Sequence, residues 1–298
     1  MSESATHASS FAHRELDFGG PLATLEWSGG DGTPLLLIHG ADGSAANWVD
    51  IAPLLPADRR VVAVDLPGFG RSPVAGRKPS MEAYGRLICE LIERELGGRA
   101  AIAGNSMGAV VAVLAASRAG EAVAATSLVA PAVPRAGSLP VDPTMVPMLA
   151  PFLVPGLAGL EARRRHGLPP ERRVRQLLDM CYAPGGRESD EAFAEMIDVA
   201  RNRERSDQVQ GWSKAFRSLL WWLVRRGAWD REARQIRGPV QIIEGAADPI
   251  IPSRSITGAI ERHPSWSLER LEGVGHVPQL EAPKRTAEAL EKLLAEVD

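Results

Sequence analysis

Cysteine is scarce in this chain of 298 residues, which contains only Cys89 and Cys181. Two cysteines so far apart in the sequence cannot build a disulfide framework or the cysteine clusters that hold zinc. Nothing near either residue suggests activation of its thiol, so we expect both to be buried outside any disulfide. This usage of cysteine is typical of a reducing compartment and predicts a cytoplasmic protein. We expect no metal and no cofactor.

Long apolar runs and an excess of charge of one sign are also missing. No stretch reaches the roughly 18 apolar residues that a membrane span needs, since prolines and a glycine interrupt the apolar segment at 145–160. The net charge of -3 provides no basic surface dense enough to bind nucleic acid. Residues 1–14 lack the basic and apolar regions of a secretory signal and read as a disordered tail. A small molecule is therefore the expected partner, and a homodimer stays open as an assembly.

Short apolar runs alternate with amphipathic stretches in most of the chain. The runs that predict buried strands lie at 35–38, 61–64, 100–103, 126–130, 240–244 and 267–271. Helices are predicted between them, at 80–96, 109–118, 253–262 and 283–297. This alternation predicts an α/β fold with a mostly parallel sheet flanked by helices.

The alternation stops in the middle of the chain. From residue 132 to residue 229 the sequence is first rich in proline and apolar residues and then basic and helical in pattern. We interpret 132–229 as a helical cap, or lid, inserted into a core formed by 15–131 and 230–298.

The sharpest motif is G-N-S-M-G at 104–108, between a predicted strand and a predicted helix. A turn this tight requires glycine two positions before and after the serine, because the flanking chains approach closely there. The hydroxyl of Ser106 is then presented to a cleft at the positive end of the following helix. This context predicts that Ser106 is a catalytic nucleophile.

A serine nucleophile needs a base and an acid that orients the base. Asp248 follows the strand at 240–244 in E-G-A-A-D-P, and His276 lies in the glycine-rich loop G-V-G-H-V-P. Asp248 could instead be a turn-forming aspartate before a proline, and His276 could be a solvated loop histidine. The order serine, aspartate, histidine along the chain favours a Ser-His-Asp triad of Ser106, His276 and Asp248.

Two backbone N–H groups are expected to form an oxyanion hole. Met107, directly after the nucleophile, supplies the first, and Ala41, in the loop after the strand at 35–38, supplies the second. His39 could be mistaken for the base. A histidine at a strand end followed by glycine is instead expected to shape the oxyanion loop.

Five motifs in this order resemble the α/β-hydrolase superfamily. They are H-G-A-D-G at 39–43, D-L-P-G-F-G-R-S at 65–72, G-N-S-M-G at 104–108, E-G-A-A-D-P at 244–249 and G-H-V-P-Q-L-E-A-P at 275–283. The resemblance implies an eight-stranded, mostly parallel sheet, a helical cap, and the triad and oxyanion roles given above. It also implies that Asp65 and Arg71 are structural residues.

The predicted cap supplies candidates for a substrate pocket. We assign to it Met145, Met148, Phe152, Trp221, Trp222, Arg201 and Arg203, with Val277 beside the histidine. Apolar side chains of this kind could hold an acyl or aromatic group, although packing between helices is the competing explanation. The arginines could instead hold a carboxylate.

The expected activity is hydrolysis of a small, largely apolar ester through an acyl-enzyme. The alternative is a carbon–carbon bond hydrolase that acts on dienone-acid ring-fission products, because G-N-S-M-G resembles the nucleophile motif of those enzymes. They usually carry Trp after the catalytic histidine, where this chain has Val277. A cofactorless haloperoxidase or perhydrolase would use the same triad. A non-catalytic binding protein on this fold would be expected to have a broken triad.

Overall fold

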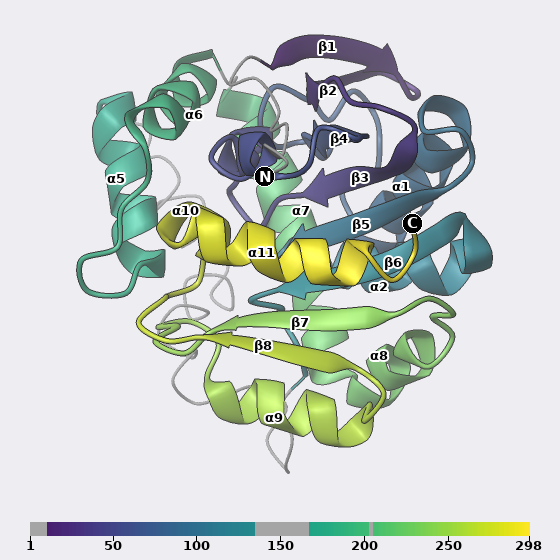
Figure 1. Ribbon diagram of the computed structural model, residues 1–298. Helices are drawn as coiled ribbons and strands as arrows, with labels where there is room; N and C mark the ends of the chain where they lie inside the picture. The colour runs from purple at the N-terminus through teal and green to yellow at the C-terminus, as the bar shows by residue number, and fades with distance from the viewer. Residues whose placement is uncertain (1–10, 135–166, 203–204) are drawn as a thin grey trace, which may run out of the picture.

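The computed structural model describes residues 11–134, 167–202 and 205–298. Eight strands form one sheet in the order β1-β2-β4-β3-β5-β6-β7-β8 (Figure 1). Their bounds are β1 Ala12–Asp17, β2 Pro21–Trp27, β3 Gly32–Ile38, β4 Arg59–Val64, β5 Ala100–Asn105, β6 Val123–Val129, β7 Val240–Gly245 and β8 Ser267–Leu271. β1 and β2 pair antiparallel, as do β2 and β4, and the remaining pairs are parallel. The predicted eight-stranded, mostly parallel sheet is confirmed.

Helices cover both faces of the sheet. Successive residues of a strand point to opposite faces, so Leu36 and Ile38 of β3 pack in one apolar cluster and Leu35 and Leu37 in the other. The first cluster includes α1 (Met81–Glu95), α2 (Met107–Ala119) and α9 (Ser253–Arg262), and the second includes α11 (Pro283–Leu294). Strands buried on both faces explain the continuous apolar runs in the sequence.

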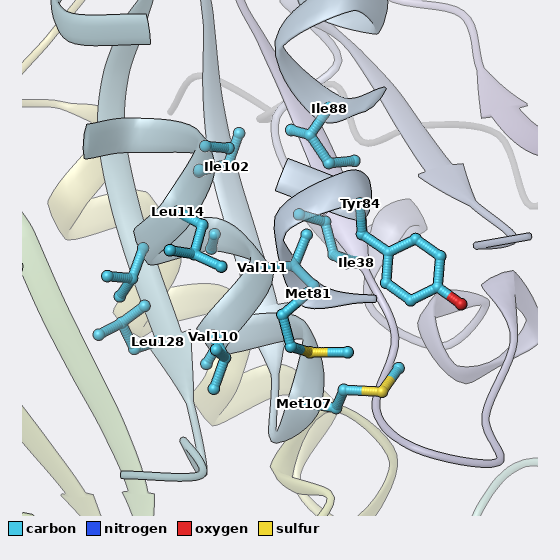
Figure 2. Close-up of a cluster of buried hydrophobic side chains, with 14 of the residues drawn as sticks. Ile38, Met81, Tyr84, Ile88, Ile102, Met107, Val110, Val111, Leu114 and Leu128 are labelled. Atoms are coloured by element: carbon cyan, nitrogen blue, oxygen red, sulfur yellow. The ribbon is translucent and has the colours of Figure 1, made fainter. Parts of the chain in front are cut away.

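The packing of α1 against α2 fixes the helix behind the candidate nucleophile. Figure 2 shows Met81, Tyr84 and Ile88 of α1 beside Val111 and Leu114 of α2. The two helices approach closely at Gly85, where an added Cβ would lie 3.0 Å from the Leu114 Cβ. A larger residue at position 85 would therefore push α2 away from α1.

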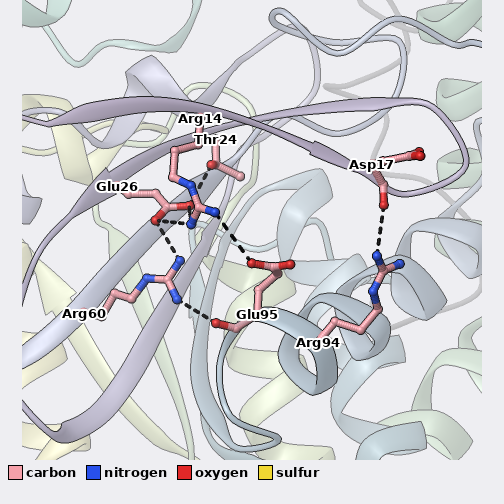
Figure 3. Close-up of polar contacts among 7 residues, drawn as sticks. All are labelled: Arg14, Asp17, Thr24, Glu26, Arg60, Arg94 and Glu95. Atoms are coloured by element: carbon pink, nitrogen blue, oxygen red, sulfur yellow. Dashed lines mark hydrogen bonds and ion pairs between the residues drawn. The ribbon is translucent and has the colours of Figure 1, made fainter.

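The edge strand β1 occupies residues that we expected to be disordered. Arg14, the last residue of the predicted tail, lies within β1 and pairs with Glu26 of β2 at 3.1 Å. Glu26 also accepts from Arg60 of β4 at 2.7 Å, so one carboxylate joins three strands (Figure 3). The tail prediction is thus wrong for 12–14, because pairing to β2 orders a segment with no apolar pattern.

The described part of the segment between β6 and β7 is mainly helical. It contains α5 (Pro170–Cys181), α6 (Asp190–Asn202), α7 (Arg205–Val224) and α8 (Arg226–Ala233). α8 runs across residue 229, where we expected the insertion to end. Within the described ranges, no helix has the length and apolarity required to cross a membrane.

A buried histidine joins α8 to the end of α9. The Nε2 atom of His263 lies 3.2 Å from Oδ1 of Asp230, which also accepts from Nε of Arg262 at 3.0 Å. The His263 ring stacks on Trp266 with 4.4 Å between the ring centroids. Burial lowers the pKa of His263 below its ordinary value of 6.5, against the opposing effect of Asp230.

This shift predicts a loss of stability on mild acidification. Below pH 6.5 the unfolded chain binds a proton at His263 before the folded chain does, so the free energy of unfolding falls as the pH falls. His263→Gln is expected to flatten that slope in thermal melts between pH 7.5 and about 5. Equal slopes in the wild type and in His263→Gln would contradict the prediction.

Candidate active site

Ser106 lies in a strained turn between β5 and α2. Its φ of 52° and ψ of -109° fall in a region that non-glycine residues rarely adopt. An added Cβ at Gly104 would lie 2.2 Å from the carbonyl oxygen of Gly108, and one at Gly108 would lie 2.4 Å from that of Ile38. Both glycines of the motif are therefore required by close backbone approach.

Backbone hydrogen bonds hold this turn in place. The N–H of Ser106 donates to the carbonyl of Val129 at 2.9 Å, and the carbonyl of Ser106 accepts from Ala109 at 3.1 Å and from Ala132 at 3.3 Å. Ser106 is thus attached to the end of β6 as well as to its own helix. The surrounding structure can maintain the strain, as expected for a preorganised nucleophile.

Asp248 and His276 form a buried pair. Oδ2 of Asp248 lies 2.8 Å from Nδ1 of His276, and the two side chains are 3% and 6% exposed. Oδ1 of Asp248 accepts from the N–H groups of Ile250 at 2.7 Å and Ile251 at 2.9 Å. Because a carboxylate only accepts hydrogen bonds, Nδ1 carries a proton, and in the neutral ring Nε2 then keeps its lone pair. This is the tautomer that a general base requires.

Asn105 joins the serine turn to the histidine loop. Its side-chain amide donates to the carbonyl of Val129 at 3.2 Å and to the carbonyl of His276 at 3.1 Å. The two segments, 171 positions apart in sequence, thus meet at the carboxyl-end edge of the parallel strands, although β6 and β7 lie between β5 and β8 in the sheet. Ligands of open α/β sheets bind at this edge. From the sequence alone, Asn105 contributed to a family resemblance, and no structural role was predicted for it.

The loop after β3 lies against the serine. An added Cβ at Gly40 would lie 3.3 Å from Cβ of Ser106, which places the neighbouring Ala41 close to the candidate nucleophile. Met107 is the first residue of α2, so its N–H has no partner within the helix. The proposed oxyanion donors, Ala41 and Met107, therefore come from the two segments that adjoin Ser106.

His39 is engaged with the backbone. Its Nδ1 lies 2.7 Å from the carbonyl oxygen of Gly40, and its Nε2 accepts from the N–H of Leu66 at 3.1 Å. The ring is fully buried. Both nitrogens hold the loop in shape, which agrees with a structural role for His39.

Asp65 and Arg71 also hold chain segments together. Asp65 accepts from the N–H groups of Ala45 at 2.7 Å and Arg71 at 2.8 Å. The guanidinium of Arg71 pairs with Glu195 of α6 at 2.7 Å and with Asp198 at 2.5 Å. Burial opposes its charge, but the two carboxylates outweigh burial and raise the pKa of Arg71. Arg71 thus binds the insertion to the core.

The candidate pocket residues are dispersed. Met145, Met148, Phe152 and Arg203 lie outside the described residues. Of the others, Val277 is buried beside His276, and Trp222 is buried with its N–H donating to Glu82 of α1 at 2.9 Å.

The last two pocket candidates lie at the surface. Trp221 is 40% exposed and carries the guanidinium of Arg225 over its ring. Arg201 pairs with Glu171 at 2.5 Å, and both side chains are exposed. In the described structure, neither side chain is placed to line a buried pocket near Ser106.

Comparison with known proteins gives evidence on the family that is independent of the geometry of the site. A family model described as "Alpha/beta hydrolase family" matches residues 35–289. A dihydrolipoyllysine-residue acetyltransferase component of an acetoin cleaving system from Pseudomonas putida is 26% identical, covering 94% of this chain and 69% of that protein. A pimeloyl-[acyl-carrier protein] methyl ester esterase from Aromatoleum aromaticum is 26% identical, covering 87% and 97%.

A third relative is similar over a shorter stretch. The 2-hydroxy-6-oxo-6-(2'-aminophenyl)hexa-2,4-dienoic acid hydrolase of Metapseudomonas resinovorans is 32% identical over 104 residues, 34% of this chain and 36% of that protein. The first two relatives therefore match most of the chain, and this one about a third.

Proposed function

We propose, since the chain belongs to the alpha/beta hydrolase family, that it hydrolyses small, largely apolar esters with Ser106 as nucleophile, His276 as base and Asp248 as the orienting acid. The observation that carries the proposal is the buried Asp248–His276 pair of 2.8 Å beside the strained serine turn. A relative that is a methyl ester esterase, matched over 97% of its length, supports the choice of ester.

The proposed reaction has two halves. The Oγ atom of Ser106 attacks the ester carbonyl carbon while its proton passes to Nε2 of His276. The carbonyl oxygen becomes an oxyanion that accepts from the N–H groups of Met107 and Ala41. The C–O bond then breaks, and the alcohol leaves with the proton from Nε2. Water attacks the acyl-enzyme, with His276 again taking and returning the proton, and the acid departs.

Carbon–carbon hydrolysis is the second candidate. It is supported by the partial match to a dienoic acid hydrolase and by G-N-S-M-G at 104–108. That reaction needs a buried cation for the substrate carboxylate. Arg201, one of the two arginines assigned to that role, is exposed and paired with Glu171, which argues against its holding a substrate carboxylate.

A substrate panel distinguishes the two. Purified enzyme is assayed against p-nitrophenyl esters of graded acyl length and against a dienone acid. We expect efficient turnover of at least one ester, slow turnover of the dienone acid, and a change of less than about twofold in Arg201→Ala, as for an exposed ion pair. Efficient cleavage of the dienone acid, lost in Arg201→Ala while ester turnover stays weak, would overturn the ester proposal.

A cytoplasmic setting is part of the proposal. Neither Cys89 nor Cys181 is in a disulfide, and burial raises the pKa of the Cys89 thiol. A thiol held in its neutral form reacts slowly with oxidants. The two free thiols support a reducing compartment, and the raised pKa supports a structural role for Cys89.

A further inference from the structure

Glu281 makes three backbone contacts that the proposed reaction leaves unexplained. It ends the short helix α10 (Pro278–Glu281) and is partly buried. Its Oε2 accepts from the N–H groups of Ala183 at 2.8 Å and Gly275 at 3.0 Å, and its Oε1 accepts from that of Val277 at 3.3 Å. Gly275 and Val277 are the two neighbours of the candidate base.

The insertion contacts the same loop directly. The N–H of His276 donates to the carbonyl of Cys181, the last residue of α5, at 2.8 Å. An added Cβ at Gly275 would lie 2.5 Å from that carbonyl oxygen and 2.5 Å from the nitrogen of Ala183. The chain at 181–183 is therefore packed on the histidine loop with no room for a side chain between them.

Together these contacts fix three consecutive N–H groups. Those of Gly275 and Val277 go to Glu281, and that of His276 goes to Cys181. We propose that Glu281 is a positioning residue that acts through His276, and that it couples the inserted helices to the triad. The proposal rests on the proposed function, because it assumes that His276 is the base.

The chemistry of the site favours a carboxylate over an amide. All three partners of Glu281 are N–H donors, and an ionised carboxylate accepts through both oxygens without donating. A glutamine could keep its carbonyl oxygen on Ala183 and Gly275, but its NH2 group would then face the N–H of Val277. Substitution by glutamine should therefore loosen the loop on the side that follows His276.

The surroundings of Glu281 raise its pKa above the ordinary value. Burial raises its pKa, the three N–H groups lower it, and the nearby charge of Asp248 raises it again. Tyr182, whose hydroxyl donates to Glu188 at 2.8 Å, is close enough for the charge of Glu281 to act on it. Cys181 and His276 are the other titratable residues in the segments that meet at Glu281. Protonation of Glu281 as the pH falls would weaken its contacts, as the glutamine does.

The test measures the rate at which a fluorophosphonate labels Ser106, which does not depend on knowing the substrate. At neutral pH we expect Glu281→Gln to be labelled ten- to a hundredfold more slowly than wild type, the range expected for a displaced catalytic group. The same loss should appear in kcat for a p-nitrophenyl ester, with KM within about twofold. Glu288→Gln, at an exposed glutamate of α11, is the matched control and should behave as wild type.

Two readouts separate positioning from mere stabilisation. The ratio of wild-type to Glu281→Gln rates should shrink as the pH falls, because wild type then also carries an uncharged side chain. A constant ratio, or a lower melting temperature with an unchanged labelling rate, would overturn the proposal. Should Glu281→Gln not fold, Glu281→Asp keeps the charge but shortens its reach, and wild-type labelling rates in that variant would overturn it equally. Absence of labelling in wild type would instead refute the proposed function.

Discussion

Replacing Ser106 by alanine is expected to lower kcat/KM for the best p-nitrophenyl ester by about a thousandfold or more, as in other triads that lose their nucleophile. The turn that holds Ser106 has backbone hydrogen bonds that do not involve the hydroxyl, so the variant should fold. Steady-state kinetics and a thermal melt of the same preparation check both statements.

A second serine on the same helix provides the control. Ser117 of α2 lies toward the end of the helix, where its hydroxyl contacts Glu232 of α8 at 2.8 Å. Ser117→Ala should keep wild-type turnover, although it loses that contact. Turnover in Ser106→Ala above about a tenth of wild type would mean that another group attacks the substrate.

Asp248→Asn is expected to reduce kcat by about a thousandfold to ten-thousandfold while the fold is retained. The asparagine carbonyl can still accept from Ile250 and Ile251, which places its NH2 group against Nδ1 of His276. An NH2 donor there forces the ring proton onto Nε2, and a protonated Nε2 cannot accept the proton of Ser106. Kinetics with a melting temperature near that of wild type would check this prediction.

Glu244 is the nearest other carboxylate in sequence that could serve as the orienting acid. It lies on β7, four positions before Asp248. It pairs with Arg270 of β8 at 3.1 Å. Glu244→Gln should therefore keep most of the turnover. Full activity in Asp248→Asn combined with a large loss in Glu244→Gln would show that the wrong acid was chosen.

The strands at the centre of the sheet were predictable from the sequence, and the edge strand β1 was not. The run at 240–244 lies in β7, which is buried along its whole length, and the amphipathic stretch at 253–262 coincides with α9. β1 is almost wholly exposed and carries His13, Arg14 and Glu15, so no apolar alternation marks it. Its order comes from pairing with β2 and from ion pairs, which are contacts between segments.

The candidate site divides in a similar way. Glycine spacing around Ser106 and the loops of Asp248 and His276 are local signals, and the structure brings the latter two together. The contacts of Glu281 and Cys181 pass through backbone atoms, which no residue type encodes. A carboxylate in the turn that directly follows the histidine loop was the one available signal for Glu281.

The aromatic residues of the insertion show a further limit of prediction from sequence. The pattern at Trp221 and Trp222 fits a pocket as well as it fits helix packing. In the structure the N–H of Trp222 reaches Glu82 of α1, whereas Trp221 faces solvent. Which face of an inserted helix meets the core depends on the arrangement of the neighbouring helices, and the amphipathic pattern alone does not determine it.

The most direct measurement is the mass of the intact protein after reaction with a fluorophosphonate, followed by mapping of the modified peptide. The account predicts a single adduct on Ser106, absent from Ser106→Ala and formed much more slowly in Asp248→Asn. An adduct at another residue, or no adduct with a folded and active enzyme, would contradict the assignment of Ser106 as the nucleophile.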